Sequence, residues 1–313
     1  MSAEGSGVDR PIGPVEPEPE GVPGPPGLPL GRRVELPGRG TTFVREVAGP
    51  PGAPTVVLLH GWLASGGLNW FRAFEPLSRH FHVVAPDLRG HGRGIRSRRR
   101  FRLGDCADDV AAMCEVLGIG SAVVVGYSLG GPVAQLTWRQ HPDLVDGLVL
   151  CATSQAIVPV VHQRLMFTTA MAAAAGTTRL SQMMTRLPRS FVKRFWPLET
   201  GSGRPGTLQR WAAAEMRRHS WRTLLEAGHA SGNYNASRWI GEVDVPTAVL
   251  ITTKDRALSP LMQARLAFSI PGAAIHRVDE GHMVCASPGF GAPLVTACLD
   301  VARQLDSRDA DIA

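Results

Sequence analysis

Short apolar runs recur along this chain and alternate with stretches of helical periodicity. Most runs are dominated by valine, leucine, isoleucine and alanine, and they lie at 55–59, 82–85, 122–125, 148–152, 247–252 and 274–278. Runs of this kind are typical of strands buried on both faces of a parallel sheet. Two further strand-like stretches, 33–36 and 42–47, flank a turn rich in glycine. They predict an antiparallel start to the sheet.

The segments between these runs carry apolar residues at spacings of three and four, which predicts amphipathic helices. Trp70, Phe74 and Leu77 share one face of a helix expected over 69–79. Another helix is expected over 105–117, with acids in its first turn. A repeated order of strand and helix implies right-handed crossovers. The pattern predicts an α/β fold with a mostly parallel, doubly wound, eight-stranded sheet.

The strand rhythm stops in the second half of the chain, where a set of helices is expected instead. Helical patches lie at 163–175, 178–187, 208–218 and 222–230. We interpret residues 154–240 as a helical lid inserted into a core formed by 31–153 and 241–306. Residues 1–30 alternate proline, glycine and glutamate, a composition that favours a disordered tail. Residues 307–313 are also expected to be disordered.

Composition bounds the class of protein without identifying its chemistry. Hydrophobic residues make up 44% of the 313 residues and charged residues 19%, and the net charge is +6. This is enough apolar material for a packed interior. The five cysteines lack metal-ligand spacing and are typical of reduced thiols inside a cell. Because no signal-peptide pattern or long apolar run is present, we expect a cytoplasmic protein without a membrane span.

The stretch around Ser128 carries the strongest chemical signal. A buried strand ends in Gly-Tyr-Ser-Leu-Gly at 126–130, and a helical pattern begins at Pro132. A serine on so tight a turn needs glycine beside it, and the turn lifts the hydroxyl above the sheet. This order of strand, motif and helix predicts a nucleophile elbow with Ser128 as nucleophile, rather than an ordinary turn serine.

A serine nucleophile needs a base and a third group that orients the base. In a parallel sheet these partners should follow later strands. Asp255 lies just beyond one of the later apolar runs, and His282 follows the last of them. We therefore predict a catalytic triad of Ser128, Asp255 and His282. Asp279 and Glu280 are alternative carboxylates, although both lie too close in sequence to His282 to approach its ring from behind.

The oxyanion formed during acyl transfer needs two backbone N–H donors, each worth roughly 3 kcal/mol. Leu129 supplies one by its position directly after the nucleophile, at the start of a helix. The other should come from the loop after the strand at 55–59, where glycine lets the backbone approach a ligand. We choose Trp62 for this oxyanion hole, and we expect its indole to form part of the wall.

Five motifs in this order resemble the α/β-hydrolase superfamily over residues 33–306. They are His-Gly-Trp at 60–62, Asp-Leu-Arg-Gly-His-Gly at 87–92, the elbow at 126–131, the Asp255 loop, and Gly281-His282. The resemblance is closest to esterase, lipase and perhydrolase-like members with a helical lid. It implies neither a metal nor an organic cofactor, and it implies a structural role for His60. One departure is Leu63-Ala64, where many relatives have a proline.

The predicted lid is rich in methionine, whose adaptable side chain favours an apolar pocket. We take Tyr127, Met166 and Met171 as candidate substrate contacts, although such residues also pack a lid onto a core. Six arginines lie between residues 93 and 102. They favour contact with an anionic partner or a lipid surface, or else an ordinary solvated loop. With only Phe101 among them, nucleic-acid binding is not expected.

The leading hypothesis is a serine esterase, a lipase-like carboxylesterase that cleaves small apolar esters through an acyl-enzyme on Ser128. With peroxide, a thiol or an alcohol as acceptor, the same triad would make a perhydrolase, thioesterase or acyltransferase. Hydrolysis of a carbon–carbon bond is a further alternative. The rival from another class is a non-catalytic protein that binds small molecules on the same fold. Acyl chain length and oligomeric state stay open.

Overall fold

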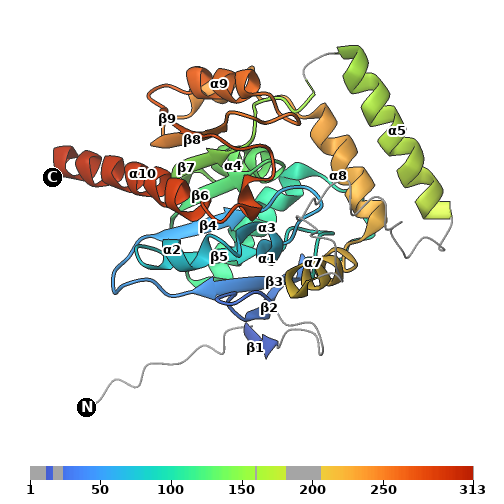
Figure 1. Cartoon of the computed structure of the whole chain (residues 1–313), viewed down its shortest axis with the longest axis horizontal. Coiled ribbons are helices and arrows are strands. Elements are labelled where there is room, and N and C mark those ends of the chain that lie inside the picture. Colours follow the sequence, from blue (N-terminus) through green and yellow to red (C-terminus); the bar gives the residue numbers. More distant parts are fainter. Residues whose placement is uncertain (1–11, 17–23, 159–160, 181–205, 313) are drawn as a thin grey trace.

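The computed structural model describes residues 12–16, 24–158, 161–180 and 206–312. Within these residues nine strands form one sheet in the order β1-β2-β3-β5-β4-β6-β7-β8-β9 (Figure 1). The strands are β1 (Ile12–Glu16), β2 (Gly31–Leu36), β3 (Gly40–Val47), β4 (Thr55–Leu59), β5 (His82–Pro86), β6 (Ala122–Tyr127), β7 (Val145–Cys151), β8 (Thr247–Thr252) and β9 (Ala274–Val278). The pairs from β1 to β5 are antiparallel and those from β5 to β9 are parallel. The predicted fold is confirmed, with one strand more than expected.

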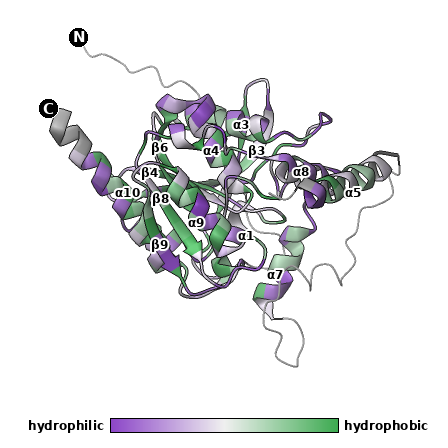
Figure 2. Ribbon diagram, turned by 90° about the horizontal axis from the view of Figure 1, so that it is seen from above, coloured by the Kyte–Doolittle hydropathy of each residue, from purple (hydrophilic) through white to green (hydrophobic). Residues whose placement is uncertain are grey.

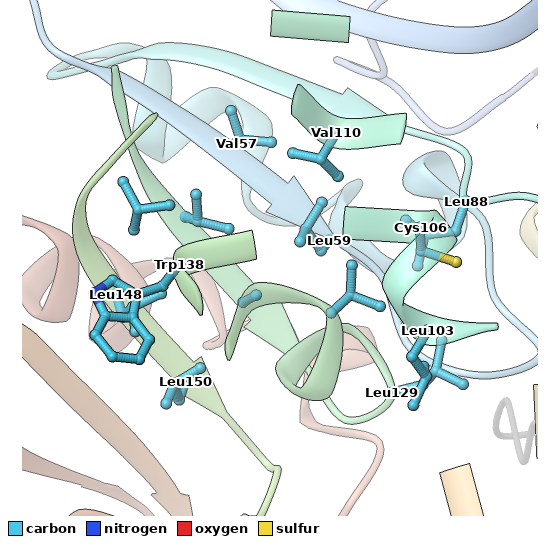
Figure 3. Close-up of a cluster of buried hydrophobic side chains, with 14 of the residues drawn as sticks. Val57, Leu59, Leu88, Leu103, Cys106, Val110, Leu129, Trp138, Leu148 and Leu150 are labelled. Carbon is cyan, nitrogen blue, oxygen red and sulfur yellow. The ribbon is translucent and has the colours of Figure 1, made fainter. Parts of the chain in front are cut away.

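Helices cover both faces of this sheet. They are α1 (Gly66–Trp70), α2 (Phe74–Ser78), α3 (Leu103–Leu117), α4 (Gly130–Gln140), α5 (Val161–Leu180), α7 (Thr207–Met216), α8 (Trp221–Asn233), α9 (Pro260–Ser269) and α10 (Gly291–Ile312). Val57 and Leu59 of β4 share a core with α3 and α4 on one face (Figure 3). Val56 and Leu58 point to the other face, toward α1, α2 and α10. A strand with apolar residues at every position is stable only when both faces are covered, which explains the layered arrangement.

The helix expected over 69–79 is divided into α1 and α2. Pro76 explains the break, because it has no N–H to donate to the carbonyl four residues earlier. The N–H of Ala73 closes a tight turn on the Trp70 carbonyl at 2.7 Å instead. The other expected strands and the helices at 105–117, 208–218 and 222–230 are present with shifted ends. Helix α9 was not among the expected elements.

Both expected disordered ends contain regular structure. Residues 12–16 form β1, which pairs with the outer edge of β2, and an edge position tolerates the proline in this strand. The Pro29 carbonyl accepts a hydrogen bond from Arg45, and Leu28 packs against the core. Residues 1–11 and 17–23 lie outside the described part. At the other end α10 continues through the expected disordered segment to Ile312.

The chain between β7 and β8 forms α5, α7 and α8, where helices were expected. Helix α5 packs along α8, and the two lie side by side at the edge of the molecule (Figures 1 and 2). The helix expected at 163–175 is part of α5, whereas that at 178–187 falls mostly outside the described residues. No helix in the described part is long and apolar enough to cross a membrane. All five cysteines are buried and unpaired.

Candidate active site

Ser128 occupies a strained turn between β6 and α4. Its φ is 51°, in the left-handed region that a residue with a Cβ seldom adopts. Glycines make this turn feasible. A Cβ on Gly130 would lie 2.1 Å from the Leu59 carbonyl oxygen, and one on Gly126 would lie 2.5 Å from the Gly130 oxygen. The motif therefore packs the start of α4 directly against the ends of β4 and β6, and it places Ser128 at the carboxyl edge of the sheet.

His282 lies beside this serine, in the loop that follows β9. Its Nε2 is 3.0 Å from Ser128 Oγ, and its Nδ1 is 2.7 Å from Asp255 Oδ2. Strands β6, β7, β8 and β9 are adjacent and parallel, so the loops at their carboxyl ends lie along one edge of the sheet. The structure thus brings together the three residues predicted as a triad, from positions far apart in the sequence.

Asp255 is held by more than the histidine. Its Oδ1 accepts hydrogen bonds from the backbone N–H groups of Ala257 (2.8 Å) and Leu258 (2.9 Å). Its Oδ2 also accepts from Thr252 Oγ1 (2.9 Å) and Gln263 Nε2 (3.1 Å). Burial alone would raise the pKa of this carboxyl, but the hydrogen bonds from His282 and the two amides outweigh it and lower the pKa. Asp255 therefore stays ionised although its side chain is fully buried.

Thr252 and Gln263 were not among the predicted site residues. Thr252 ends the strand before the acid, and Gln263 lies on α9, so each reaches Asp255 from a different element. The signal for Thr252 was available in its position at the end of β8. Gln263 had no sequence signal because α9 itself was not expected.

Tyr127 corrects one of the predicted substrate contacts. It is 3% exposed, its ring packs edge-on against Trp70 and Phe290, and its hydroxyl donates to the carbonyl oxygen of His282. The residue before the nucleophile ends a strand with both faces covered, so its side chain points into the core. Tyr127 therefore supports the histidine loop from below and offers little surface to a substrate.

The loop after β4 lies against the nucleophile. A Cβ on Gly61 would be 3.4 Å from the Cβ of Ser128, and the Gly61 N–H is already bonded to Asn69 Oδ1 at 2.9 Å. Trp62 follows Gly61, and its indole N–H donates to the Leu224 carbonyl at 2.9 Å. Leu129 lies at the start of α4 and is 2% exposed. Both residues chosen for the oxyanion hole thus lie near Ser128. That their backbone N–H groups bind the oxyanion stays a prediction.

The two alternative carboxylates, Asp279 and Glu280, have structural partners, and so does Asp87 at the end of β5. Asp279 forms an exposed ion pair with Lys254 at 2.7 Å, which lowers the pKa of the carboxyl. Glu280 accepts from Ser287. Asp87 is buried and accepts from the backbone N–H groups of Gly66 and Arg93. Burial raises its pKa in spite of these bonds. None of these three carboxylates is hydrogen-bonded to His282 among the described contacts.

His60 lies just before the loop and has a fixed tautomer. Its Nε2 accepts from the Leu88 N–H at 2.9 Å, so its Nδ1 carries the proton and donates to the Gly61 carbonyl at 2.8 Å. Burial lowers its pKa to about 3, and the ring stays neutral. The described residues contain no group of three or more His, Cys, Asp or Glu side chains placed to hold a metal ion.

The two methionines chosen as substrate contacts differ in position. Met166 lies on α5 and is 72% exposed, so it lines no closed pocket. Met171, one and a half turns later, approaches α8: its Sδ would lie 3.2 Å from a Cβ on Gly228. The same Cβ would lie 3.0 Å from the indole of Trp62. Met171 thus packs over the helix that covers the loop after β4.

The arginine run divides into fixed and exposed residues. Arg93 is 7% exposed and pairs with Glu215 on α7 at 3.4 Å. Arg96 donates to the carbonyl of Gly92 at 2.6 Å and to that of Arg218, which follows α7. The arginines at 98–100 are exposed. The first part of the run therefore attaches α7 and the segment after it to the loop that follows β5.

Comparison with known proteins identifies the family of the fold. The sequence model of the alpha/beta hydrolase fold family matches residues 54–287. The chain is similar to a poly(3-hydroxyalkanoate) depolymerase of Ectopseudomonas oleovorans, with 28% identity over 270 residues, 81% of this chain and 88% of that protein. It is also similar to a pimeloyl-[acyl-carrier protein] methyl ester esterase of Chromobacterium violaceum, with 32% identity over 234 residues, 72% of this chain and 86% of the relative.

Solved structures show the same fold. An esterase from Exiguobacterium antarcticum aligns with a TM-score of 0.68 at 18% identity, over 84% of this chain and 97% of that one. The family match covers most of the chain, including the turn at Ser128 and the loops that carry Asp255 and His282. This protein belongs to the alpha/beta hydrolase family.

Proposed function

We propose that this hydrolase cleaves carboxylic esters through an acyl-enzyme on Ser128. The observation that carries the proposal is the unbroken hydrogen-bonded series from Ser128 Oγ to His282 Nε2 (3.0 Å) and from His282 Nδ1 to Asp255 Oδ2 (2.7 Å). A serine hydroxyl is a weak nucleophile unless a base accepts its proton. The series would supply that base in the correct tautomer, and it supports acyl transfer as the reaction class.

In the first step Ser128 Oγ attacks the ester carbonyl while its proton moves to His282 Nε2. Because Asp255 is ionised and only accepts hydrogen bonds, Nδ1 of His282 carries a proton and Nε2 presents its lone pair to the serine. The imidazolium that forms is stabilised by the adjacent carboxylate. The oxyanion is stabilised by the backbone N–H groups of Trp62 and Leu129, aided by the positive end of the α4 dipole.

The imidazolium then protonates the leaving alcohol, and the carbon–oxygen bond of the ester breaks. A water molecule next loses a proton to His282 and attacks the acyl carbon, and collapse of the second intermediate returns the proton to Ser128. Every proton transfer uses Nε2, since Nδ1 stays bonded to Asp255. The His282 loop must therefore be held in place, and the hydrogen bond from the Tyr127 hydroxyl to the His282 carbonyl contributes to this.

We propose an apolar ester as substrate and the helical segment between β7 and β8 as the lid over it. The support is the position of Met171 and Gly228 above the Trp62 indole, and the names of the two relatives, one a depolymerase and one a methyl ester esterase. Water is the simplest acceptor for the acyl group. A cytoplasmic location is consistent with five buried, unpaired cysteines.

A fluorophosphonate probe tests the proposal, because it reacts only with an activated serine. We expect the native protein to be labelled and Ser128→Ala to be unlabelled, with Ser78→Ala, a half-buried serine of α2 bonded to the Glu75 carbonyl, labelled at the native rate. Native protein that folds and stays unlabelled would favour a binding protein. A panel of p-nitrophenyl esters from acetate to long chains, each with water, peroxide, a thiol or an alcohol as acceptor, then identifies the acyl group and the acceptor.

A further inference from the structure

The loop after β4 is joined to the α7–α8 segment by three hydrogen bonds, made at Trp62, Leu63 and Ser65. They run from Trp62 Nε1 to the Leu224 carbonyl (2.9 Å), from His219 Nε2 to the Leu63 carbonyl (3.2 Å) and from Ser65 Oγ to Glu215 Oε2 (3.2 Å). Their partners are separated by about 150 residues in the chain. The segment 215–224 thus forms part of the wall that holds this loop in place.

His219 makes the central bond of this set and has a single tautomer. The Gly92 N–H donates to its Nδ1 at 2.7 Å, so its Nε2 carries the proton and donates to the Leu63 carbonyl. The ring is 6% exposed and lies 5.7 Å from the ring of His91. Burial and the nearby His91 lower its pKa to about 3, so the donor is neutral over the pH range in which a serine hydrolase works.

The hydrogen bond from His219 is made to a turn whose backbone conformation is unfavourable. The Ala64 N–H donates to the Gly61 carbonyl at 3.3 Å, which closes a four-residue turn with Trp62 and Leu63 at its centre. The φ of Leu63 is 63°. A positive φ at the third position of a turn is usual for glycine and unfavourable for leucine. The turn therefore adopts a conformation that its own sequence disfavours, and the hydrogen bond from His219 is one of the contacts that keeps it there.

We propose that His219 is a positioning residue for the oxyanion hole. By holding the Leu63 carbonyl it keeps the 61–64 turn closed, and it thereby keeps the Trp62 N–H directed at the carbonyl oxygen of a substrate on Ser128. This inference rests on the proposed function, because it assigns a task to the donor named there. It also makes residues 215–224 a fixed part of the active site, in contrast to a lid segment that moves away to admit substrate.

Two isosteric variants separate this role from simple packing. The amide nitrogen of Gln in His219→Gln reaches the position of Nε2 and can still donate to Leu63, whereas the amide oxygen of Asn in His219→Asn reaches the position of Nδ1 and can only accept from Gly92. We expect His219→Asn to lower kcat and the rate of fluorophosphonate labelling by about 10- to 100-fold, with KM changed less than about threefold. His219→Gln should stay within about fivefold of native.

The matched control is His229→Asn on α8. His229 Nδ1 also donates to a backbone carbonyl, that of Thr168 at 3.0 Å, and none of its described hydrogen bonds reaches the 61–64 turn. Its kcat should be native within about twofold. Equal losses in His219→Gln and His219→Asn would overturn the inference, as would a loss in His219→Asn that appears only in KM.

A second background keeps the test decisive if His219→Asn folds poorly. Leu63→Gly removes the cost of the positive φ, so the turn should persist without the histidine. In this background Gln and Asn at position 219 should give kcat values within about threefold of each other. A tenfold or larger difference there would contradict the inference. If the native protein is not labelled at Ser128, the proposed function fails. If the native protein is labelled and substitutions at position 219 leave the labelling rate unchanged, only the present inference fails.

Discussion

Replacing Asp255 with asparagine should prevent His282 from acting as a base while leaving the size of the side chain at position 255 unchanged. Oδ1 of Asp255 accepts from the N–H groups of Ala257 and Leu258, so the asparagine oxygen must stay on that side to satisfy them. Its NH₂ group then faces Thr252 Oγ1, Gln263 Nε2 and His282 Nδ1, where the carboxylate accepted hydrogen bonds. His282 can pair with this NH₂ only by releasing the proton from Nδ1, which moves the proton to Nε2.

A proton on Nε2 leaves Ser128 facing a donor in place of a base. The same change in a well-studied serine protease lowers kcat by about 10⁴-fold, and we expect a loss of that order here, with KM nearly unchanged. Stability should fall as well, because Thr252, Gln263 and His282 lose a charged acceptor at Oδ2, and a hydrogen bond to a charged group is worth about 1.5–3 kcal/mol. The two bonds to Oδ1 are retained and His282 can pair with the new NH₂ group, so we expect a decrease of about 1–3 kcal/mol in the free energy of unfolding.

The assay is hydrolysis of p-nitrophenyl butyrate at pH 7 to 8, with urea unfolding of each variant followed by circular dichroism. The control is Asp279→Asn, the same chemical change on a carboxylate that is 76% exposed and paired with Lys254. It should leave kcat within about twofold of native, since exposed ion pairs contribute little. If Asp255→Asn kept more than about a tenth of native kcat, the assignment of Asp255 as the orienting group would be refuted.

Two further predictions concern groups behind the site. Tyr127→Phe removes the hydroxyl bonded to the His282 carbonyl and should lower kcat by about three- to tenfold and stability by about 1 kcal/mol, measured by ester hydrolysis and urea unfolding; unchanged kcat would show that the loop needs no such bond. His60, His91 and His219 have pKa values lowered to about 3 by burial, so unfolding takes up protons below the ordinary value of 6.5. Stability should therefore be complete above pH 6.5 and fall as the pH is lowered, by up to about 4 kcal/mol per pH unit for three histidines. Urea titrations at pH 7, 6 and 5 measure how the free energy of unfolding changes with pH. A slope that corresponds to uptake of less than one proton on unfolding would contradict the burial of these three histidines in neutral form.

The closeness of Ser128, Asp255 and His282 was predictable because strand ends determine where their loops lie. An apolar run followed by Gly-x-Ser-x-Gly and a helix defines the elbow at Ser128 without any long-range information. Parallel strands then bring their carboxyl ends to one edge, so Asp255 and His282 had few other places to go. The alternative carboxylates Asp279 and Glu280 were disfavoured by their closeness in sequence to His282, and the coordinates show each with a partner of its own.

What the sequence could not predict depends on contacts between distant segments. The strand β1 is rich in proline and glycine, and it is ordered by the free edge of β2 rather than by its own propensity. Gln263 reaches Asp255 from a helix with a weak pattern. His219 contacts a loop 156 residues away, and nothing in its neighbourhood separates it from the other nine histidines of the chain. Tyr127 was misassigned because adjacency to the nucleophile in sequence places it on the opposite face of the strand.

The central claim is that Ser128 carries the acyl group during turnover. The direct measurement is to mix the protein with excess p-nitrophenyl butyrate, quench with acid within the first turnovers, digest with pepsin and weigh the peptide that contains residue 128. The account predicts an added butyryl group on Ser128 in the native protein, and neither the adduct nor turnover in Ser128→Ala. Sustained hydrolysis by Ser128→Ala, or turnover by the native protein with the acyl group on another residue, would contradict it.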